Sequence, residues 1–386
     1  MFSFISPQAL HFGRGQSQKV AQFAKEFGET ALMVHGASAQ RAAWLIALVQ
    51  DAGLETRMIS CANEPSLPDI EKALLSLKGW KPSVVIALGG GSVMDFAKAL
   101  SALIGCKGPV QSYLEIVGDG RALDAAPIPV IALPTTAGTG AEVTKNAVIS
   151  VPEHGLKVSL RDPRMVPNIS IVDADLMQAA PRHIALAAGL DAVTQVIEPY
   201  LSSKSNPMTD ALCCAAIPDG LKALRAVVET DSAEAWDVLA WVSTCGGLAL
   251  ANAGLGAVHG FAGVIGGKTG APHGEICGRL LPFVLDAHCQ KAQKNTAVHD
   301  RLTWVLDHLD LVFANGQKGQ GRAALMNWSA QMGLRNLRQM DVSSHDFAAI
   351  VEMANDSSSM KGNPFKLTIP EVLAILNKEA LASQLE

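Results

Sequence analysis

Residues 134–144 have the sequence PTTAGTGAEVT and directly follow IPVIAL (128–133), an apolar run typical of a β-strand. This segment concentrates threonine and glycine in a turn that opens on a proline. Glycines let backbone N–H groups approach a ligand closely, and neighbouring hydroxyls suit phosphate or carbonyl oxygens. The pattern therefore predicts a ligand-binding turn at the end of a buried strand.

A second glycine-rich turn lies upstream of the first. Residues 83–100 have the sequence SVVIALGGGSVMDFAKAL, which combines a β-branched strand, three glycines and an amphipathic helix. This order places a diphosphate on the N-terminus of the helix. Two phosphate-type turns after two successive strands predict a dinucleotide ligand.

Strand-like and helix-like segments alternate through the first half of the chain. Strand-like segments occupy 30–36, 55–60, 83–91, 129–136 and 168–173, and helical spacing occurs at 40–53 and 68–78. Alternation of this kind predicts an α/β dinucleotide-binding domain whose mostly parallel sheet carries helices on both faces.

The second half contains only helix-type periodicity. Apolar-periodic segments lie at 190–202, 208–228, 234–254, 302–309 and 324–333, and no convincing strand accompanies them. We therefore expect two domains, an α/β dinucleotide-binding domain over 1–181 and an all-helical domain over 182–386.

Composition excludes several classes of protein. The 386 residues are 49% hydrophobic and 17% charged with a net charge of −5, and they contain no basic run. This balance argues against nucleic acid or an anionic membrane as partner. Seven cysteines without a CxxC pair and an N-terminus without a cationic leader predict a cytoplasmic protein. Residues 238–267 carry no charge, but their many glycines, Asn252 and His259 favour buried helices over a membrane span.

Three side chains of the helical half suggest a metal site. Asp191, His259 and His273 stand in otherwise apolar helical segments. A buried carboxylate needs a partner, and a mixed oxygen and nitrogen set suits Zn²⁺ or Fe²⁺. Each histidine could equally be a hydrogen-bonded core residue, so the spacing alone leaves both interpretations open.

Together these segments resemble the iron-containing (group III) alcohol dehydrogenases almost from end to end. The matching motifs are GGGSVMD, PTTAGTGAEVT, GLDAVTQVIE, GAVHGFAG, APHGEICGRLLP and GNPFKLT. The resemblance implies a dehydroquinate synthase-like architecture and hydride transfer between a nicotinamide cofactor and a small alcohol or aldehyde. It also implies that the helical domain over 182–386 binds the metal and the substrate. Dimers are common among such proteins, which favours a homodimer but leaves the oligomeric state open. No residue stands out as the general acid.

The resemblance places Asp191, His259 and His273 on metal-ligand positions. A fourth family ligand, a histidine, is replaced here by Gln195, one helical turn after Asp191. The amide oxygen of Gln195 is a weaker ligand, which favours Zn²⁺ or an exchangeable metal over tightly held iron. The replacement also leaves room for a metal-free reductase of the maleylacetate reductase type. A lyase of the dehydroquinate synthase type and a non-catalytic nucleotide-binding protein are further alternatives.

The resemblance also implies a set of cofactor contacts. They are Gly90, Gly91, Ser92, Asp95, Thr135, Thr136, Thr139 and Lys157. Asp95 could instead be an ordinary first-turn carboxylate of a helix, and Lys157 a surface lysine.

One position bears on the choice of cofactor. Where NAD-preferring members have an aspartate, this chain has Gly36, followed by Ser38 and Arg41. The chain therefore has no carboxylate at this position to repel a 2′-phosphate, and Ser38 and Arg41 could bind that phosphate. We expect NADP(H) to be favoured over NAD(H). Arg41 as a solvated helix residue is the alternative.

Overall fold

The computed structural model describes residues 1–178 and 180–384. Its contacts divide the chain into two compact units. The first, here called the sheet unit, comprises Ile5–Thr136 and Gly140–Ala179. The second, the helical unit, comprises Met1–Phe4, Ala137–Thr139 and Ala180–Glu386. The tip of the PTTAGTG turn is thus grouped with the helices.

The sheet unit is built on six parallel strands in the order β1-β8-β5-β4-β2-β3. The strands are β1 (Ala9–Phe12), β2 (Thr30–His35), β3 (Glu55–Ser60), β4 (Val84–Gly89), β5 (Val130–Pro134) and β8 (Ile169–Val172). The predicted parallel sheet and its five predicted strands are confirmed. Strand β1 was not predicted, because four residues are too few to show a period.

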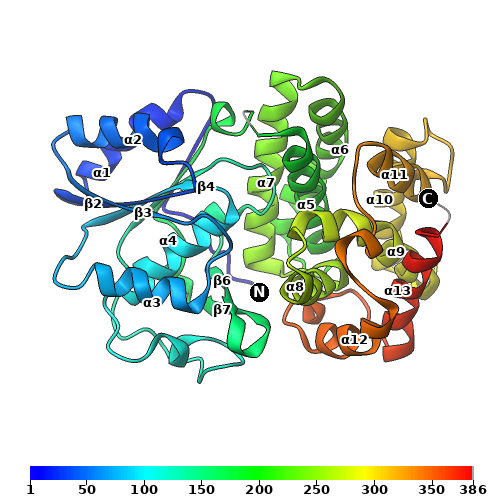
Figure 1. Cartoon of the computed structure of the whole chain (residues 1–386). Helices are drawn as coiled ribbons and strands as arrows, with labels where there is room; N and C mark the ends of the chain where they lie inside the picture. The colour runs from blue at the N-terminus through cyan, green and yellow to red at the C-terminus, as the bar shows by residue number, and fades with distance from the viewer. Residues whose placement is uncertain (179, 385–386) are drawn as a thin grey trace. The chain divides into compact units, whose positions relative to one another are not determined.

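Helices cover both faces of this sheet (Figure 1). They are α1 (Val20–Lys25), α2 (Ala39–Asp51), α3 (Leu67–Ser76) and α4 (Gly91–Leu103). Because side chains alternate along a strand, Leu32 and Val34 of β2 join one core with α3 and α4. Met33, between them, joins the other core with α1 and α2. Both faces are therefore buried, as parallel sheets require.

An antiparallel hairpin, absent from the sequence-based expectations, packs beside α4. It consists of β6 (Asn146–Val151) and β7 (Leu156–Arg161). In β6, Ala147, Ile149 and Val151 are buried while the residues between them are more exposed. This two-residue alternation is the signal that identifies the strand.

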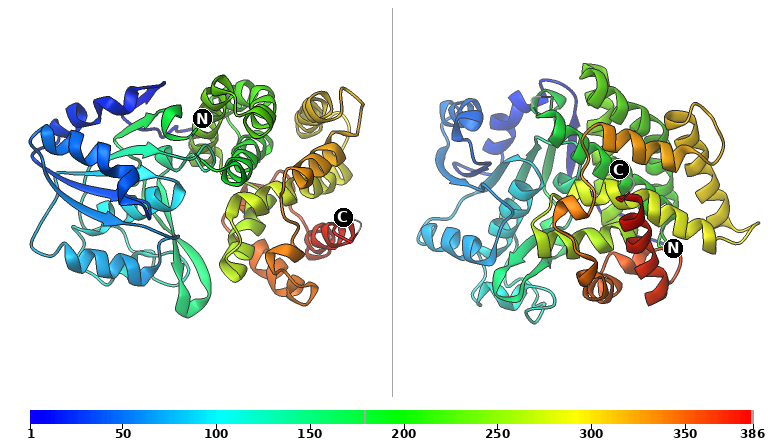
Figure 2. Two further views of the ribbon diagram at one scale, coloured as in Figure 1. Left: turned by 45° about the horizontal axis from the view of Figure 1, so that its top comes forward. Right: turned by 45° about the vertical axis from the view of Figure 1, so that its right-hand side comes forward.

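Within residues 180–384 the structure contains helices and connecting segments but no strand (Figure 2). The helices are α5 (Arg182–Leu201), α6 (Pro207–Thr230), α7 (Ala233–Ala253), α8 (Ala257–Thr269), α9 (His273–Lys291), α10 (Ala297–Phe313), α11 (Gly321–Gln331), α12 (Phe347–Asp356) and α13 (Ile369–Ala382). The predicted helical second half is confirmed.

The uncharged stretch folds into α7 and α8, which meet at a bend of 100°. Most of its side chains are buried in the helical unit. Taken singly, none of the helices in the described part of the chain has the length and apolarity to cross a membrane, and only the bent pair passes such a test together.

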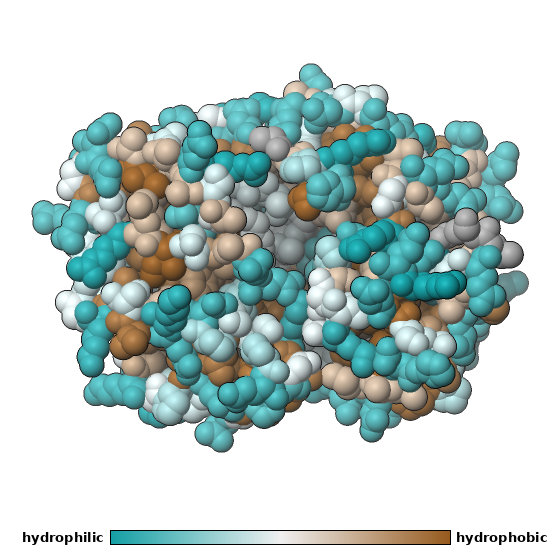
Figure 3. Space-filling model, viewed as in Figure 1, coloured by the Kyte–Doolittle hydropathy of each residue, from teal (hydrophilic) through white to brown (hydrophobic). Residues whose placement is uncertain are grey.

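Large exposed hydrophobic side chains are scattered over the surface. In the view of Figure 3, hydrophobic groups are small and lie among hydrophilic ones. Examples are Met58 of β3, Leu75 of α3 and Ile116, which belong to different segments. Scattered exposure of this kind is ordinary for a folded protein and marks no docking surface on this face.

Candidate functional site

Several of the predicted cofactor residues lie at the ends of three neighbouring strands of the sheet unit. Strands β2, β4 and β5 are adjacent and parallel, so Gly36, the Gly89–Gly91 turn and the Pro134–Thr136 turn lie at one edge. The chain places β3 outside β2 and then returns to β4 on the other side. Such a reversal opens a crevice for ligands beyond the carboxyl ends of the strands.

The two glycine turns touch each other. The N–H of Thr135 donates to the carbonyl of Gly89 at 2.9 Å. A Cβ placed on Gly90 would lie 3.2 Å from the Oγ1 of Thr136, so glycine permits this close approach. Gly90 precedes α4, and among the described residues no side chain caps that helix. The N–H groups of Gly91 and Ser92 are therefore available to an anion.

Asp95 and Lys157 are held by protein partners. Asp95 accepts hydrogen bonds from the backbone N–H of Val148 at 3.0 Å, and it pairs with Lys98 at 3.1 Å. Lys157 forms an ion pair with Glu64. These contacts give both residues a structural role, and their contact with a cofactor stays a prediction.

Lys98 is a residue that the sequence analysis missed. It is 1% exposed, and its Nζ donates to the carbonyl of Ala141 and the Oγ1 of Thr144, each at 2.9 Å. It therefore ties the PTTAGTGAEVT segment to α4. A lysine inside the apolar helix DFAKAL was the available signal.

The residues predicted to select the cofactor follow β2. Gly36 comes directly after the strand, and its carbonyl lies 2.7 Å from the Nδ1 of His35. Ser38 and Arg41, at the start of α2, are both exposed. Their side chains are thus free of packing, as a 2′-phosphate contact requires.

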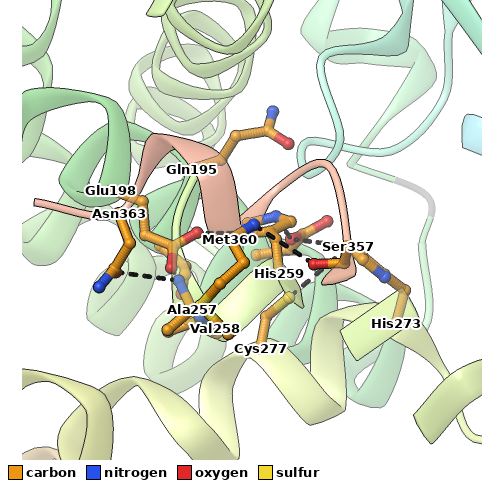
Figure 4. A network of polar contacts seen from close by, with 12 residues as sticks. Gln195, Glu198, Ala257, Val258, His259, His273, Cys277, Ser357, Met360 and Asn363 are labelled. Carbon is orange, nitrogen blue, oxygen red and sulfur yellow. Dashed lines mark hydrogen bonds and ion pairs between the residues drawn. The ribbon is translucent and has the colours of Figure 1, made fainter. Parts of the chain in front are cut away.

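Four potential metal ligands converge in the helical unit. Figure 4 labels three of them, His259, His273 and Cys277. Asp191 comes from α5, His259 from α8, and His273 and Cys277 from α9. One donor atom of each lies within 4.8 Å of those of the others. The structure therefore brings together Asp191, His259 and His273 as predicted, and adds a thiol.

Two of these donor atoms are buried without a hydrogen bond. They are the Oδ1 of Asp191 and the Nε2 of His259, which lie 3.3 Å apart. The Nδ1 of His259 lies 2.6 Å from the Oε2 of Glu198, and a proton donated to Glu198 leaves the Nε2 facing Asp191. Burial alone would lower the pKa of His259, but Cys277, Asp191 and Glu198 hold that pKa well above its ordinary value. The site therefore favours a positive charge between the two atoms, either a proton or a metal cation. The donor set therefore fits a divalent metal.

The charge state of Asp191 agrees with this interpretation. Burial alone would raise the pKa of its carboxyl, but His273 and His259 outweigh burial and lower that pKa below its ordinary value. Asp191 is therefore an anion at neutral pH. Burial raises the pKa of the Cys277 thiol to about 12.

Glu198 and Asn363 hold the start of α8 in place. Glu198 also accepts from the N–H of Val258 at 2.7 Å, and Asn363 accepts from the N–H of Ala257 at 3.2 Å. These bonds fix the helix that carries His259. The sequence analysis missed Glu198 and Cys277, although Glu198 follows Asp191 by two turns and Cys277 follows His273 by one.

Gln195 does not join the donor atoms in the structure. Its Nε2 donates to the carbonyl of Thr139 at 2.6 Å, and its side chain packs against Gly246. In Figure 4 the Gln195 amide points away from His259, His273 and Cys277. Ligation by Gln195 stays a prediction. The bond seen here connects α5 to the PTTAGTG turn.

Comparisons with known proteins cover both units. A family model described as iron-containing alcohol dehydrogenase matches residues 7–174. A second, for the C-terminal part of the Fe-containing alcohol dehydrogenase family, matches residues 185–380.

Individual relatives extend over almost the whole chain. Alcohol dehydrogenase 4 of Saccharomyces cerevisiae is 30% identical over 387 residues, which covers 97% of each protein. Lactaldehyde reductase of Escherichia coli is 30% identical over 313 residues, covering 81% of this chain and 80% of the relative. The crystal structure of a 1,3-propanediol oxidoreductase superposes with a TM-score of 0.85 at 26% identity, covering 98% of this chain and 100% of that one.

Proposed function

Because the chain belongs to the iron-containing alcohol dehydrogenase family, we propose that Asp191, His259 and His273 form the metal site of a small-alcohol dehydrogenase or aldehyde reductase. Family membership makes the chain an oxidoreductase that acts on CH–OH groups with a nicotinamide cofactor and a divalent metal. The observation that carries the proposed site is the buried Oδ1 of Asp191 facing the buried Nε2 of His259 without a hydrogen bond.

Each residue has a distinct task in this proposal. When bound, the metal supplies a Lewis acid for the carbonyl or alcohol oxygen, and the nicotinamide supplies or accepts the hydride. Asp191 contributes the negative charge that a divalent cation needs in a buried site. Glu198 keeps the Nδ1–H of His259 engaged, so the Nε2 remains the free donor atom. The N-terminus of α4 and the adjoining threonine turn receive the phosphates of the cofactor.

We propose a small, polar substrate for the site. The lactaldehyde and propanediol named for two relatives are short oxygenated compounds. The deciding experiment incubates the metal-loaded protein with NADPH or NADH and a panel of short aldehydes and hydroxyaldehydes. We expect loss of absorbance at the nicotinamide band. Cofactor binding without turnover of any aldehyde would instead favour the non-catalytic alternative.

The proposed preference for NADP(H) predicts the effect of one substitution. Gly36→Asp adds a carboxylate at the end of β2, which accepts from a ribose 2′-OH and repels a 2′-phosphate. The ratio of kcat/KM values should shift toward NAD(H) by about 1–3 kcal/mol, the scale of one charged hydrogen bond. Gly36→Ala serves as the size control. A wild-type enzyme that uses NADH tenfold better than NADPH would contradict the proposed preference.

Glu198 provides a second test, because its only proposed duty toward the metal is to orient His259. Glu198→Gln replaces a charged acceptor by a neutral one of the same size. We expect Zn²⁺ affinity to fall by roughly 10–100-fold, the usual scale for such supporting groups. Competition with a chromogenic chelator measures this, and Glu229→Gln, on α6, is the matched control. Unchanged affinity in Glu198→Gln would show that His259 needs no such support.

Two further parts of the proposal concern the surroundings of the protein. All seven cysteines are free in the structure, which supports a reducing, cytoplasmic location. The resemblance to the family supports a homodimer. Sedimentation velocity over a range of protein concentrations would test it, and a species of monomer mass throughout would contradict it.

A further inference from the structure

Cys277 lies among the donors of the proposed metal site. Its Sγ belongs to the group whose donor atoms are within 4.8 Å of one another, and it is 3.6 Å from the Nε2 of His273. Both residues are on α9, one turn apart, so the helix directs their side chains to the same side. Cys277 is fully buried.

Burial alone does not explain this position. Cys213 and Cys245 are equally buried thiols of the helical unit, on α6 and α7. Among the described residues, however, only one group of His, Cys, Asp and Glu side chains has the spacing of a metal site, and its thiol is that of Cys277. The same group contains the two buried donor atoms that have no hydrogen bond, on Asp191 and His259.

The alternative fourth ligand, Gln195, is engaged elsewhere. Its amide nitrogen donates to the carbonyl of Thr139 at 2.6 Å. To ligate the metal, Gln195 would have to give up this bond or turn its oxygen toward the site. Cys277 already lies beside the other donors. A thiolate is also a stronger ligand for Zn²⁺ than a neutral amide oxygen.

We propose that the thiolate of Cys277 is the fourth protein ligand of the metal, in place of Gln195. The inference rests on the proposed metal site of Asp191, His259 and His273. On binding, the thiol loses its proton to solvent and the sulfur forms one bond to the metal, so one proton is released for each M²⁺ bound. The resulting donors are one carboxylate oxygen, two imidazole nitrogens and one thiolate sulfur. This set favours Zn²⁺ over Mg²⁺ or Mn²⁺.

Cobalt gives a direct readout of sulfur ligation. The full-length protein is freed of metal with a chelator and titrated with Co²⁺ while the near-ultraviolet spectrum is recorded. We expect a thiolate-to-cobalt charge-transfer band that saturates at one Co²⁺ per chain. Cys277→Ser should lose this band, whereas Cys245→Ser, which removes an equally buried thiol, should keep it. Zn²⁺ affinity of Cys277→Ser should fall by roughly 10–100-fold in chelator competition.

The possible outcomes separate this inference from the proposed site. One Co²⁺ bound per chain without a charge-transfer band in the wild type leaves the site in place and overturns the role of Cys277. A chain that binds no Co²⁺ and no Zn²⁺ overturns the site and the inference together. If Cys277→Ser does not fold, X-ray absorption at the zinc edge of the Zn²⁺-loaded wild type decides. We expect a sulfur neighbour at about 2.3 Å from the zinc, and a first shell of nitrogen and oxygen alone would refute ligation.

Discussion

Replacing His259 by alanine is expected to remove the divalent metal and to lower kcat/KM by roughly 10³-fold, since metal polarisation contributes several kcal/mol to the transition state. His259 is the donor whose orientation the structure controls most closely. Its Nδ1 is bound to Glu198 at 2.6 Å, and its Nε2 lies 3.3 Å from the carboxylate of Asp191. Metal content by elemental analysis and kcat/KM with the preferred aldehyde measure the two effects.

A control variant that lacks a different histidine of the helical unit shows whether the loss of metal and activity is specific to His259. His308 is on α10, and its Nδ1 lies 2.8 Å from the carbonyl oxygen of Trp304. It does not belong to the group of candidate metal donors. His308→Gln should keep the metal and the activity. If His259→Ala retained both a full complement of metal and a normal kcat/KM, the proposed site would be wrong.

Breaking the buried ion pair between Arg279 and Glu379 is expected to lower the free energy of unfolding more than breaking an exposed ion pair does. Each side chain is 1% exposed, and the Nε of Arg279 donates to the Oε1 of Glu379 at 2.6 Å. The same Oε1 accepts from the N–H of Leu337 at 3.2 Å and the Oγ of Ser383 at 2.7 Å. The pair thus connects α9, α13 and the segment between α11 and α12.

Glu379→Ala would remove the carboxylate that lies against the buried guanidinium of Arg279. Breaking a buried pair in this way costs about 3–5 kcal/mol, much more than the intact pair contributes compared with apolar residues. Urea denaturation followed by circular dichroism measures the loss. Asp219→Asn, which removes one partner of the exposed pair with Lys222, should change stability by less than about 1 kcal/mol. If the free energy of unfolding changed by a similar, small amount in both variants, water would have to solvate the Arg279 guanidinium.

The α9 helix carries both Arg279 of this ion pair and two residues of the proposed metal site. Arg279 follows Cys277 by two residues and His273 by six, so one helix carries both the donors and the ion pair. Loss of stability in Glu379→Ala should therefore be measured with metal both present and absent. Metal binds only the folded chain, so Zn²⁺ should stabilise wild type and variant alike.

Much of the fold was predictable because periodicity is a local property of the chain. The apolar runs before GGGSVMD and PTTAGTG predicted β4 and β5, and the helical spacing after Pro181 predicted the helical unit. The short strand β1 and the hairpin of β6 and β7 were missed. The first has only four residues. In β6 the exposed Val148 is as apolar as its buried neighbours, so the alternation seen in the structure is weak in the sequence.

The sequence by itself predicted the family, the parallel α/β sheet, the helical second half and three candidate donors, Asp191, His259 and His273. Only the tertiary structure decided that Cys277 lies beside these donors, that Glu198 orients His259, and that Gln195 bonds to Thr139. The physical reason is that spacing along a helix predicts which face a side chain occupies but not what lies opposite. Glu198 and His259 are 61 residues apart, and their contact depends on how α5 and α8 pack.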